Sequence, residues 1–273
     1  MGLLEGKVAI ISGSGRGIGR AAAEIFAREG AAVVVNDLDK EPANEVVEFI
    51  KSQGGRAAAC PGNVTAPVFG DRFVKTAIDT FGGLDIIINN AGYTWDAVIQ
   101  NMTDEQWYAM IDVHATAPFR VIRAAAPFIR GAAKKEKEAG KLVQRKIVNV
   151  SSLAAFGSAG QVNYSAAKAA MIGITKTMAK EWGRFNVNVN CVTYGWIRTR
   201  LTGEKETSQD IVIEGKSIAV GVPKAGIDNM ILTLPLGRAG TPVEAASAIF
   251  FFASPLADYV TGQVLPVDGG MHI

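Results

Sequence analysis

The chain has 273 residues, a formal net charge of +2, a hydrophobic share of 48% and two cysteines. The hydrophobic share excludes a disordered or fibrous chain. The small net charge argues against nucleic-acid binding, and two cysteines cannot form a disulfide framework. No apolar run approaches the roughly 20 residues of a membrane-spanning helix, and no secretory signal is visible. We expect a cytoplasmic protein that binds neither nucleic acid nor membranes.

Short apolar segments rich in β-branched residues alternate with longer helical segments. Strands are expected at 7–12, 32–36, 57–60, 84–89, 146–150, 187–192 and 263–267. Helices are expected at about 17–30, 41–53, 67–81, 104–131, 162–184 and 241–254. Most strands are apolar nearly throughout, which indicates burial on both faces. This order predicts a doubly wound parallel α/β sheet in a single domain, residues 1–273.

Two stretches interrupt the alternation. Residues 130–146 carry seven basic and two acidic residues, which is typical of a solvated helix end, although a surface for an acidic partner or acyl carrier is the alternative. Residues 200–235 mix charge, glycine and proline before the last strand. A long insertion at this edge of such a sheet is often a mobile flap over a ligand, so a substrate flap is expected at about 200–235.

The segment GSGRGIG follows the first strand and opens the first helix. Its glycines permit a tight turn in which backbone N–H groups approach a pyrophosphate, and the helix N-terminus adds its positive dipole end. A plain strand–helix turn is the alternative, but the context favours dinucleotide binding. The residues expected to bind the cofactor here are Gly13, Ser14, Gly15, Arg16, Gly17, Ile18 and Gly19.

Asp37, at the end of the second strand, bears on the choice of dinucleotide. Its carboxylate can accept hydrogen bonds from the adenosine ribose and would repel a 2′-phosphate, which favours NAD. Arg16 argues for NADP, but a more distant cation relieves close-range repulsion poorly. We therefore expect NAD, with NADP less favoured, and Leu38 in the same site. The alternative role for Asp37 is that of a helix cap or turn residue.

Tyr164 and Lys168 are four residues apart in a helical segment, so they share one helix face. A free tyrosine has a pKa near 10. A neighbouring ammonium and a nicotinamide cation would lower that pKa, so that Tyr164 could exchange a proton with an alcohol or ketone. A serine hydroxyl could hold the substrate oxygen, and the strand end NVSS supplies Ser151 and Ser152.

Together with NNAG (89–92) and YVTGQVLPVDGG near the end, these motifs resemble the single-domain branch of the short-chain dehydrogenases/reductases, over about residues 5–270. The resemblance implies a seven-stranded Rossmann-type sheet, a homotetramer and nicotinamide-dependent alcohol–ketone chemistry. Within the family, GQVNYSAAKAA resembles 3-oxoacyl thioester reductases, whereas VVVNDL and DVHATAPFRVIRAA resemble peroxisomal (3R)-hydroxyacyl-CoA dehydrogenases.

The resemblance also implies roles for individual residues. Lys168 would bind the nicotinamide ribose as well as act on the tyrosine. The strand-end residues Asn90, Ala91 and Gly92 would line the adenosine ribose side and steady the central strand. In the loop YGWIRT, the nicotinamide carboxamide would be faced by Gly195, Ile197 and Thr199. Asn63, with Val64, would meet the adenine.

The chain departs from the family pattern at four places. His114 stands where an asparagine usually holds a water of the proton relay; a histidine can hold water and titrates near neutrality, although a packed helix histidine is the alternative. The segment after SS is one residue short, so strand-end alignment selects Ser152 and counting back from the tyrosine selects Ser151; we choose Ser152. Asn63 replaces an aspartate, and Tyr194 replaces a proline.

These observations predict an NAD(H)-dependent oxidoreductase of a secondary alcohol or ketone, best a 3-hydroxyacyl/3-oxoacyl thioester. The expected catalytic residues are Ser152, Tyr164, Lys168 and His114, and no metal site is evident. A dehydrogenase of a cyclic, terpenoid or sugar alcohol is the rival; Trp95, Tyr194 and Trp196 would then form an aromatic wall or simply pack. A non-catalytic nucleotide-binding scaffold is the rival from another class.

Overall fold

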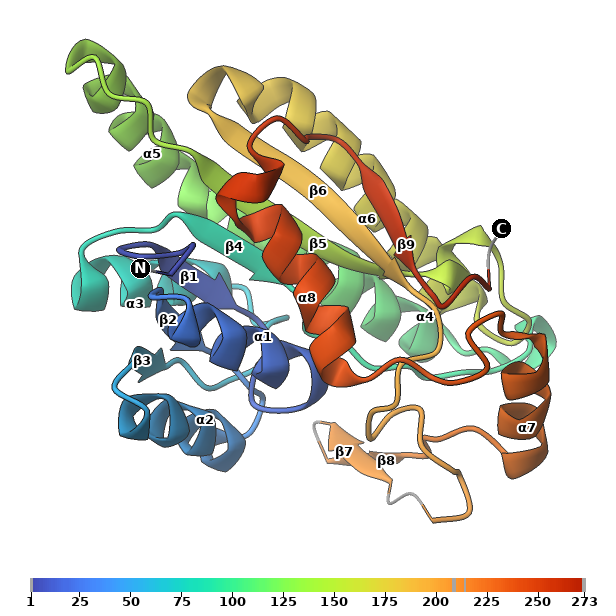
Figure 1. Ribbon diagram of the computed structural model, residues 1–273. Coiled ribbons are helices and arrows are strands. Elements are labelled where there is room, and N and C mark those ends of the chain that lie inside the picture. Colours follow the sequence, from blue (N-terminus) through green and yellow to red (C-terminus); the bar gives the residue numbers. More distant parts are fainter. Residues whose placement is uncertain (1, 208–209, 214, 272–273) are drawn as a thin grey trace.

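The computed structural model describes residues 2–207, 210–213 and 215–271, and a parallel sheet runs through it (Figure 1). The strand order is β3-β2-β1-β4-β5-β6-β9. The strands are β1 Val8–Ile11, β2 Ala32–Val35, β3 Arg56–Ala59, β4 Ile86–Asn89, β5 Arg145–Ser152, β6 Val187–Tyr194 and β9 Val264–Val267. The expected seven-stranded, doubly wound sheet is thereby confirmed.

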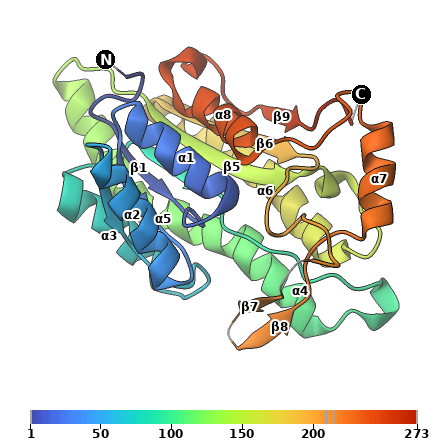
Figure 2. The same ribbon diagram turned by 60° about the horizontal axis from the view of Figure 1, so that its bottom comes forward.

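Helices cover both faces of this sheet, as Figures 1 and 2 show. They are α1 Gly17–Arg28, α2 Lys40–Ser52, α3 Phe69–Phe81, α4 Asp104–Ile111, α5 Ala117–Glu138, α6 Val162–Trp182, α7 Lys224–Thr233 and α8 Pro242–Ala253. Helices α1, α2 and α8 share one apolar core with the sheet, and α3, α5 and α6 share the other. The near-continuous apolar strands follow from this two-sided burial.

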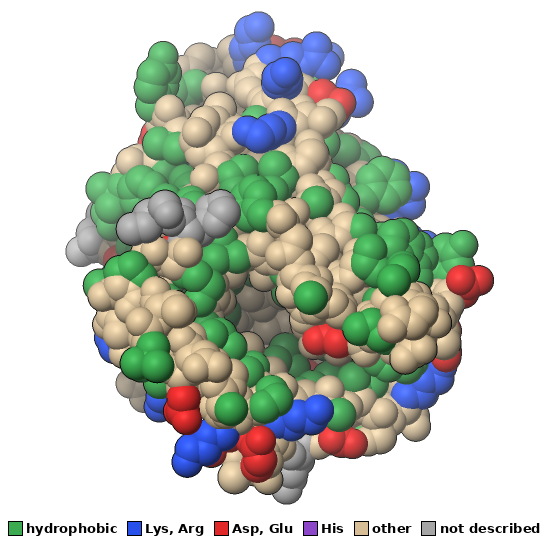
Figure 3. All heavy atoms as spheres, turned by 90° about the vertical axis from the view of Figure 1, so that its right-hand side faces the viewer, with side chains coloured by type: hydrophobic (Ala, Val, Ile, Leu, Met, Phe, Trp, Pro, Cys, Tyr) green, Lys and Arg blue, Asp and Glu red, His purple; other side chains and the backbone are tan. Residues whose placement is uncertain are grey.

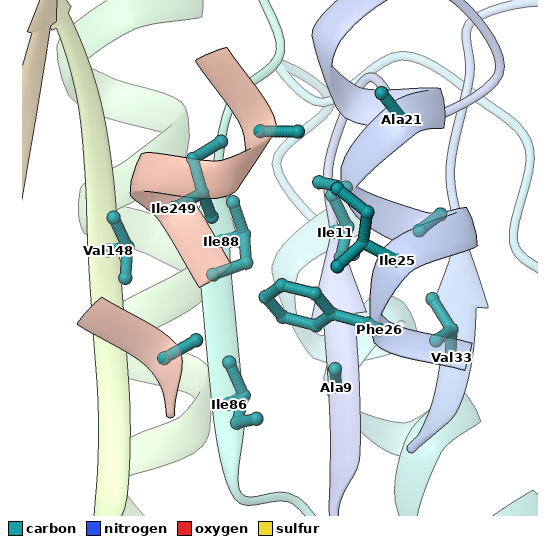
Figure 4. Packing of buried hydrophobic residues seen from close by; sticks show 14 of the residues in the cluster. Ala9, Ile11, Ala21, Ile25, Phe26, Val33, Ile86, Ile88, Val148 and Ile249 are labelled. Atoms are coloured by element: carbon teal, nitrogen blue, oxygen red, sulfur yellow. The ribbon is translucent and has the colours of Figure 1, made fainter. Parts of the chain in front are cut away.

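In the core shared with α1, α2 and α8, helix side chains pack directly on the central strands (Figure 4). Ile11 on β1 and Ile88 on β4 are fully buried, and Phe26 from α1 lies among them. Ile249 on α8 packs against the same strands. Because the carboxyl ends of all these strands meet at one edge, side chains that follow them gather there.

Two buried asparagines link neighbouring strands on the other face. Asn89 of β4 and Asn149 of β5 are paired in register, and the Asn89 amide donates to Asn149 Oδ1 at 2.8 Å. Asn149 in turn donates to the hydroxyl of Thr175 on α6 at 2.9 Å. All three residues are at most 5% exposed, so this polar chain is satisfied inside the core.

The helix expected at 104–131 is not continuous. A π-helical turn, Asp112–Thr116, separates α4 from α5. Such an inserted turn adds a residue to the helix and is frequent at functional sites. The periodicity of the sequence did not reveal it, because an apolar stripe tolerates one extra residue.

The basic stretch 130–146 divides into two parts. Four lysines at the end of α5 and beyond it are exposed: Lys134, Lys135, Lys137 and Lys141. The last two cations are buried at the start of β5, where Arg145 pairs with Glu136 and Lys146 pairs with Asp258, each at 2.6 Å. Only the first part is a solvated surface.

The expected flap region has structure of its own beside the sheet edge (Figures 1 and 2). It contains an antiparallel hairpin, β7 Ile211–Ile213 and β8 Lys216–Ile218, followed by α7. The hairpin packs against Tyr93 and Trp95 through a small apolar cluster. Among the described residues, no helix is both long and apolar enough to cross a bilayer.

Candidate active site

The glycine turn between β1 and α1 is shaped by close backbone approaches. Gly13 and Gly17 have positive φ angles of 62° and 55°, which favour glycine. A Cβ at Gly13 would lie 2.7 Å from the Ala91 Cα, and one at Gly19 would lie 2.2 Å from the Gly13 carbonyl oxygen. No side chain caps α1 at Arg16, so the turn leaves a cradle with helix N–H groups available to a pyrophosphate.

Two buried polar residues that were not anticipated hold this turn. Asn36 accepts a hydrogen bond from the Gly13 N–H and donates to the Cys60 and Gly62 carbonyls. Ser12 Oγ accepts from the backbone N–H groups of Asn90 and Ala91. A polar residue inside an apolar run, as in VVVND, was the available signal, because a buried amide needs partners.

Other predicted residues have structural partners here. Asn90 donates its side-chain amide to the Ser12 and Gly13 carbonyls, both at 3.0 Å, in keeping with a steadying role. The Ser14 hydroxyl is buried and donates to the Ile11 carbonyl. Asn63 Oδ1 accepts hydrogen bonds from both the N–H and the hydroxyl of Thr65. The side-chain oxygen that was expected to contact the adenine therefore already accepts from two donors.

The adenosine end carries a charge cluster. Arg16 Nη1 lies 2.8 Å from Asp37 Oδ1, and Arg16 Nη2 lies 3.0 Å from Asp39 Oδ2. The backbone N–H of Asp39 also donates to Asp37 Oδ1. Asp37 Oδ2 faces the turn, where a Cβ at Gly15 would lie 2.5 Å from it. Arg16, which argued for NADP in the sequence, is thus paired with Asp37, the carboxylate that argued for NAD. Leu38, beside Asp37, is 36% exposed.

The pair on α6 is brought together as the spacing indicated. Lys168 Nζ lies 5.5 Å from the centroid of the Tyr164 ring. The ammonium group donates to the Val150 carbonyl at 2.9 Å, and Lys168 is only 4% exposed. Both side chains therefore face the end of β5, one turn of helix apart.

The two serines at the end of β5 have different surroundings. Ser151 is buried and donates its hydroxyl to the Lys168 carbonyl at 2.8 Å. Ser152 Oγ caps the following turn by accepting from the Ala154 N–H at 3.2 Å, and its side chain also hydrogen-bonds Tyr164. The geometry thus puts Ser152 beside the phenol and gives Ser151 a partner in the helix backbone.

His114 lies in the π turn, against the catalytic candidates. Its ring meets the Tyr164 ring edge-on, with centroids 5.0 Å apart, and its Nε2 lies 2.7 Å from the Tyr93 carbonyl oxygen. Because a carbonyl only accepts, Nε2 carries the proton and Nδ1 is an acceptor. Nδ1 is buried and has no hydrogen-bond partner within the described part of the chain.

Burial changes the pKa values of three residues at the catalytic end, and two of these values differ from the expected ones. Desolvation and the nearby Lys168 charge hold the pKa of His114 well below its usual 6.5, so this histidine is neutral and does not titrate near neutrality as expected. Desolvation raises the pKa of Tyr164 to about 12, opposed by its hydrogen bond with Ser152. It also lowers the pKa of Lys168 to about 8. In the protein alone, burial outweighs the expected lowering of the tyrosine pKa.

A loop after β4 is fastened to the start of α6, and its role was not anticipated. Asp96 accepts a hydrogen bond from Gln161 at 2.8 Å, and buried Asn163 donates to the Trp95 carbonyl. The Asp96 charge is near enough to raise the pKa of Tyr164, and burial raises the pKa of Asp96 itself. The Asp96 carboxylate therefore acts electrostatically on the phenol of Tyr164.

The loop after β6 contains the three residues expected to face the nicotinamide carboxamide. Ile197 is 5% exposed and bridges to Gly240, so its side chain belongs to the core. A Cβ at Gly195 would lie 2.7 Å from the Asp268 Cβ. Thr199 exchanges hydrogen bonds with Thr202 and receives the Leu201 N–H, beside the glycine turn.

Two of the three aromatic residues considered for a substrate wall are core residues. Tyr194 is 6% exposed and donates its hydroxyl to the Ala245 carbonyl at 2.7 Å. Trp196 is 7% exposed and packs against Ile227 from α7. Trp95 is half-buried below the flap hairpin, with Lys216 Nζ 5.6 Å from its ring centroid. The packing interpretation therefore holds for Tyr194 and Trp196.

The face on the right-hand side of Figure 1 is hollowed at its centre, and hydrophobic side chains line part of the hollow, with an acidic side chain at its edge (Figure 3). Helices α4 and α7 lie on this side of the molecule. In the part of the chain that the structure describes, no group of three or more His, Cys, Asp or Glu residues could hold a metal ion. His272, the other histidine, lies outside the described residues.

Comparison with known proteins adds independent evidence. Residues 13–272 match a family model described as enoyl-(acyl carrier protein) reductase. The chain is 38% identical to the 3-oxoacyl-(acyl-carrier-protein) reductase FabG of Vibrio cholerae, with 99% of each chain covered. It is 37% identical to the FabG of Thermotoga maritima, with the same coverage.

Solved structures agree in fold. A short-chain dehydrogenase/reductase from Brucella melitensis superposes with a TM-score of 0.81 at 27% identity, covering 100% of this chain and 99% of that one. A gluconate 5-dehydrogenase from Burkholderia cenocepacia, in complex with NADP and tartrate, gives a TM-score of 0.84 at 28% identity, covering 98% and 96%. The chain therefore belongs to the short-chain dehydrogenase/reductase family and is an oxidoreductase that uses a nicotinamide dinucleotide.

Proposed function

We propose that this enzyme interconverts a 3-oxoacyl thioester and the 3-hydroxyacyl thioester, with NAD(H) preferred over NADP(H). The observation that carries the reaction type is the convergence of Tyr164, Lys168 and Ser152 at the end of β5. The substrate class is supported by the two FabG relatives named above and by the hydrophobic side chains on part of the rim of the hollowed face. Hydrophobic side chains there suit an acyl chain.

The preference for NAD rests on Asp37. Its Oδ2 faces the glycine turn and accepts no hydrogen bond from the described residues, so ribose hydroxyls can donate to it. A 2′-phosphate would meet this carboxylate and that of Asp39, and would have to draw Arg16 away from both. That exchange costs two charge-assisted hydrogen bonds, which favours the unphosphorylated ribose.

Each residue of the site has a proposed task. When bound, the dinucleotide supplies or accepts a hydride. Tyr164 donates a proton to the carbonyl oxygen in the reductive direction, and Ser152 donates a hydrogen bond to the same oxygen. The Lys168 ammonium favours the phenolate that remains. The neutral His114 offers Nδ1 to a water molecule, which continues the proton path from Lys168.

The raised tyrosine pKa has a consequence for the direction of proton transfer. At neutral pH the phenol is protonated in the protein alone, which suits donation to a ketone. Oxidation needs the phenolate, and a bound nicotinamide cation would have to lower the pKa further. The protonated phenol is therefore the form that serves reduction, and ionisation of Tyr164 in the complex is the form that serves oxidation.

A sugar-acid substrate is the second candidate, since a structural relative is a gluconate 5-dehydrogenase. Asp96 disfavours it, because a carboxylate close enough to raise the tyrosine pKa would repel a substrate carboxylate bound at Tyr164. Neutral sugar and cyclic alcohols stay as rivals in the test below.

The test is an absorbance assay at about 340 nm, where the reduced nicotinamide absorbs. Acetoacetyl-CoA, an acetoacetyl carrier-protein thioester, gluconate, ribitol and cyclohexanol would each be tried with both dinucleotides. We expect the highest kcat/KM for a thioester with NADH. A higher value for a sugar or cyclic alcohol would contradict the substrate, and binding without turnover of any compound would support a scaffold.

A further inference from the structure

The first turn of the flap lies directly against the glycine turn. A Cβ at Gly17 would lie 3.7 Å from Thr199 Cγ2. Thr199 is held there by its hydrogen bonds with Thr202, and the Arg198 N–H donates to the Gly240 carbonyl at 2.8 Å. The backbone of Arg200, the next residue, therefore starts close to the N-terminus of α1.

Arg200 joins the charge cluster of the adenosine end. It interacts electrostatically with Arg16, Asp37 and Asp39, and partial burial together with the like charge of Arg16 lowers its pKa. Both terminal nitrogens of Arg16 already form ion pairs with these two carboxylates. In the described ranges 2–207, 210–213 and 215–271, no hydrogen bond or ion pair joins Arg200 to a carboxylate.

Arg200 is thus an exposed cation of this cluster, and it directly follows Thr199, which lies against the glycine turn proposed for the pyrophosphate. The carboxylates keep it in the cluster, whereas Arg16 repels it. A phosphate group entering the cradle would relieve that repulsion, because it is an anion between two cations. A guanidinium can bind phosphate through two parallel hydrogen bonds.

We infer that Arg200 binds a phosphate group of the dinucleotide and thereby ties the flap to the occupied cofactor site. This inference rests on the proposed binding of the dinucleotide at the glycine turn. The phosphate has two possible sources: the pyrophosphate, which NAD and NADP share, and the 2′-phosphate, which only NADP carries. In either case the flap is ordered by the cofactor before the substrate arrives.

The test compares Arg200→Gln with Arg198→Gln, a neighbouring exposed arginine for which no ion pair is seen in the described structure. Calorimetry would measure the dissociation constants of NAD⁺ and NADP⁺ without any substrate. Loss of one charge-assisted contact should weaken binding about tenfold or more in Arg200→Gln and leave Arg198→Gln within about twofold of the parent. Hydrogen exchange of residues 200–235, with and without nucleotide, gives a second readout.

The outcomes separate the possibilities. Equal weakening for both dinucleotides assigns the pyrophosphate, and weakening confined to NADP⁺ assigns the 2′-phosphate. Nucleotide-induced protection of the flap in the parent and in Arg198→Gln, but not in Arg200→Gln, supports the tie. Unchanged affinities and protection in Arg200→Gln would overturn this inference alone. A parent protein that binds neither nucleotide would overturn the proposed function and this inference with it.

Discussion

The adenosine end and the catalytic end of the site treat charge in opposite ways. At the adenosine end, Arg16 is partly exposed and bridges two carboxylates. At the catalytic end, Lys168 is buried, and its ammonium group donates to a backbone carbonyl. Paired charge near water costs little, whereas a buried ammonium without a carboxylate is destabilised. Changes at the first end should alter cofactor choice, and changes at the second should alter rate and pH dependence.

Among the variants that test this contrast between the two ends, Tyr164→Phe should have the largest effect. Removing the hydroxyl eliminates the proton donor, and we expect kcat to fall by about 10³-fold or more. The ring stays, so the affinity for NAD⁺ should change little. Steady-state kinetics and calorimetry on the same preparation would check both. Turnover close to that of the parent would rule out Tyr164 as the proton donor.

Gly92→Ala tests the packing of the catalytic end. The new Cβ would lie 2.1 Å from the Cε1 atom of His114, so the ring must move away from Tyr164. We expect a loss of about 1–3 kcal/mol in the free energy of unfolding and a lower kcat. Gly131→Ala in α5 is the matched control, because nothing lies within 4 Å of its Cβ position. It should be neutral or stabilising, and equal behaviour of the two variants in denaturant melts would contradict the proposed crowding.

Asp37→Asn tests the adenosine end. Loss of the carboxylate frees Arg16 to meet a 2′-phosphate, so the ratio of kcat/KM for NADPH to that for NADH should rise about tenfold. The kcat with the better cofactor should stay near that of the parent, because the catalytic end is untouched. A ratio that does not move would show that other groups decide the cofactor.

The pH dependence of stability in Lys168→Met tests the burial of the ammonium group. Burial lowers the pKa of Lys168 from 10.5 to about 8, so between these values the unfolded state binds more protons than the folded state. This group therefore destabilises the folded protein below about pH 8, and its penalty disappears as the pH rises toward 10.5. The stability of the parent relative to Lys168→Met should rise from pH 7.5 to 10 in chemical denaturation. A constant difference would contradict the lowered pKa.

The fold could be predicted almost completely because its signals are local. Seven apolar strands and the helices between them leave few topologies once crossovers are right-handed. The π turn at 112–116 escaped, because an extra residue in a helix has no composition of its own. The hairpin in the flap escaped as well, since short strands such as Ile211–Ile213 make up little of a mixed segment.

The candidate site could be predicted where it depends on spacing and not where it depends on surroundings. Four residues of spacing suffice to bring Tyr164 and Lys168 together. The pKa of His114 depends on its burial by residues distant in sequence, and the pairing of Arg16 with Asp37 depends on how the turn meets β2. Arg200 and Asp96 reach the site from separate loops, which no motif in the chain joins.

The asparagine pair between β4 and β5 fixes which residues of β5 face each side of the sheet. Along β5, alternate residues face opposite sides of the sheet, and a shift of one residue exchanges the two sets. Such a shift would bury Val148 or Val150 against polar partners. It would also leave both asparagine amides without hydrogen-bond partners, which destabilises the fold. It would also exchange Ser151 with Ser152. Two amides that satisfy each other deep in the protein therefore determine which of two adjacent hydroxyls is left at the surface of the site.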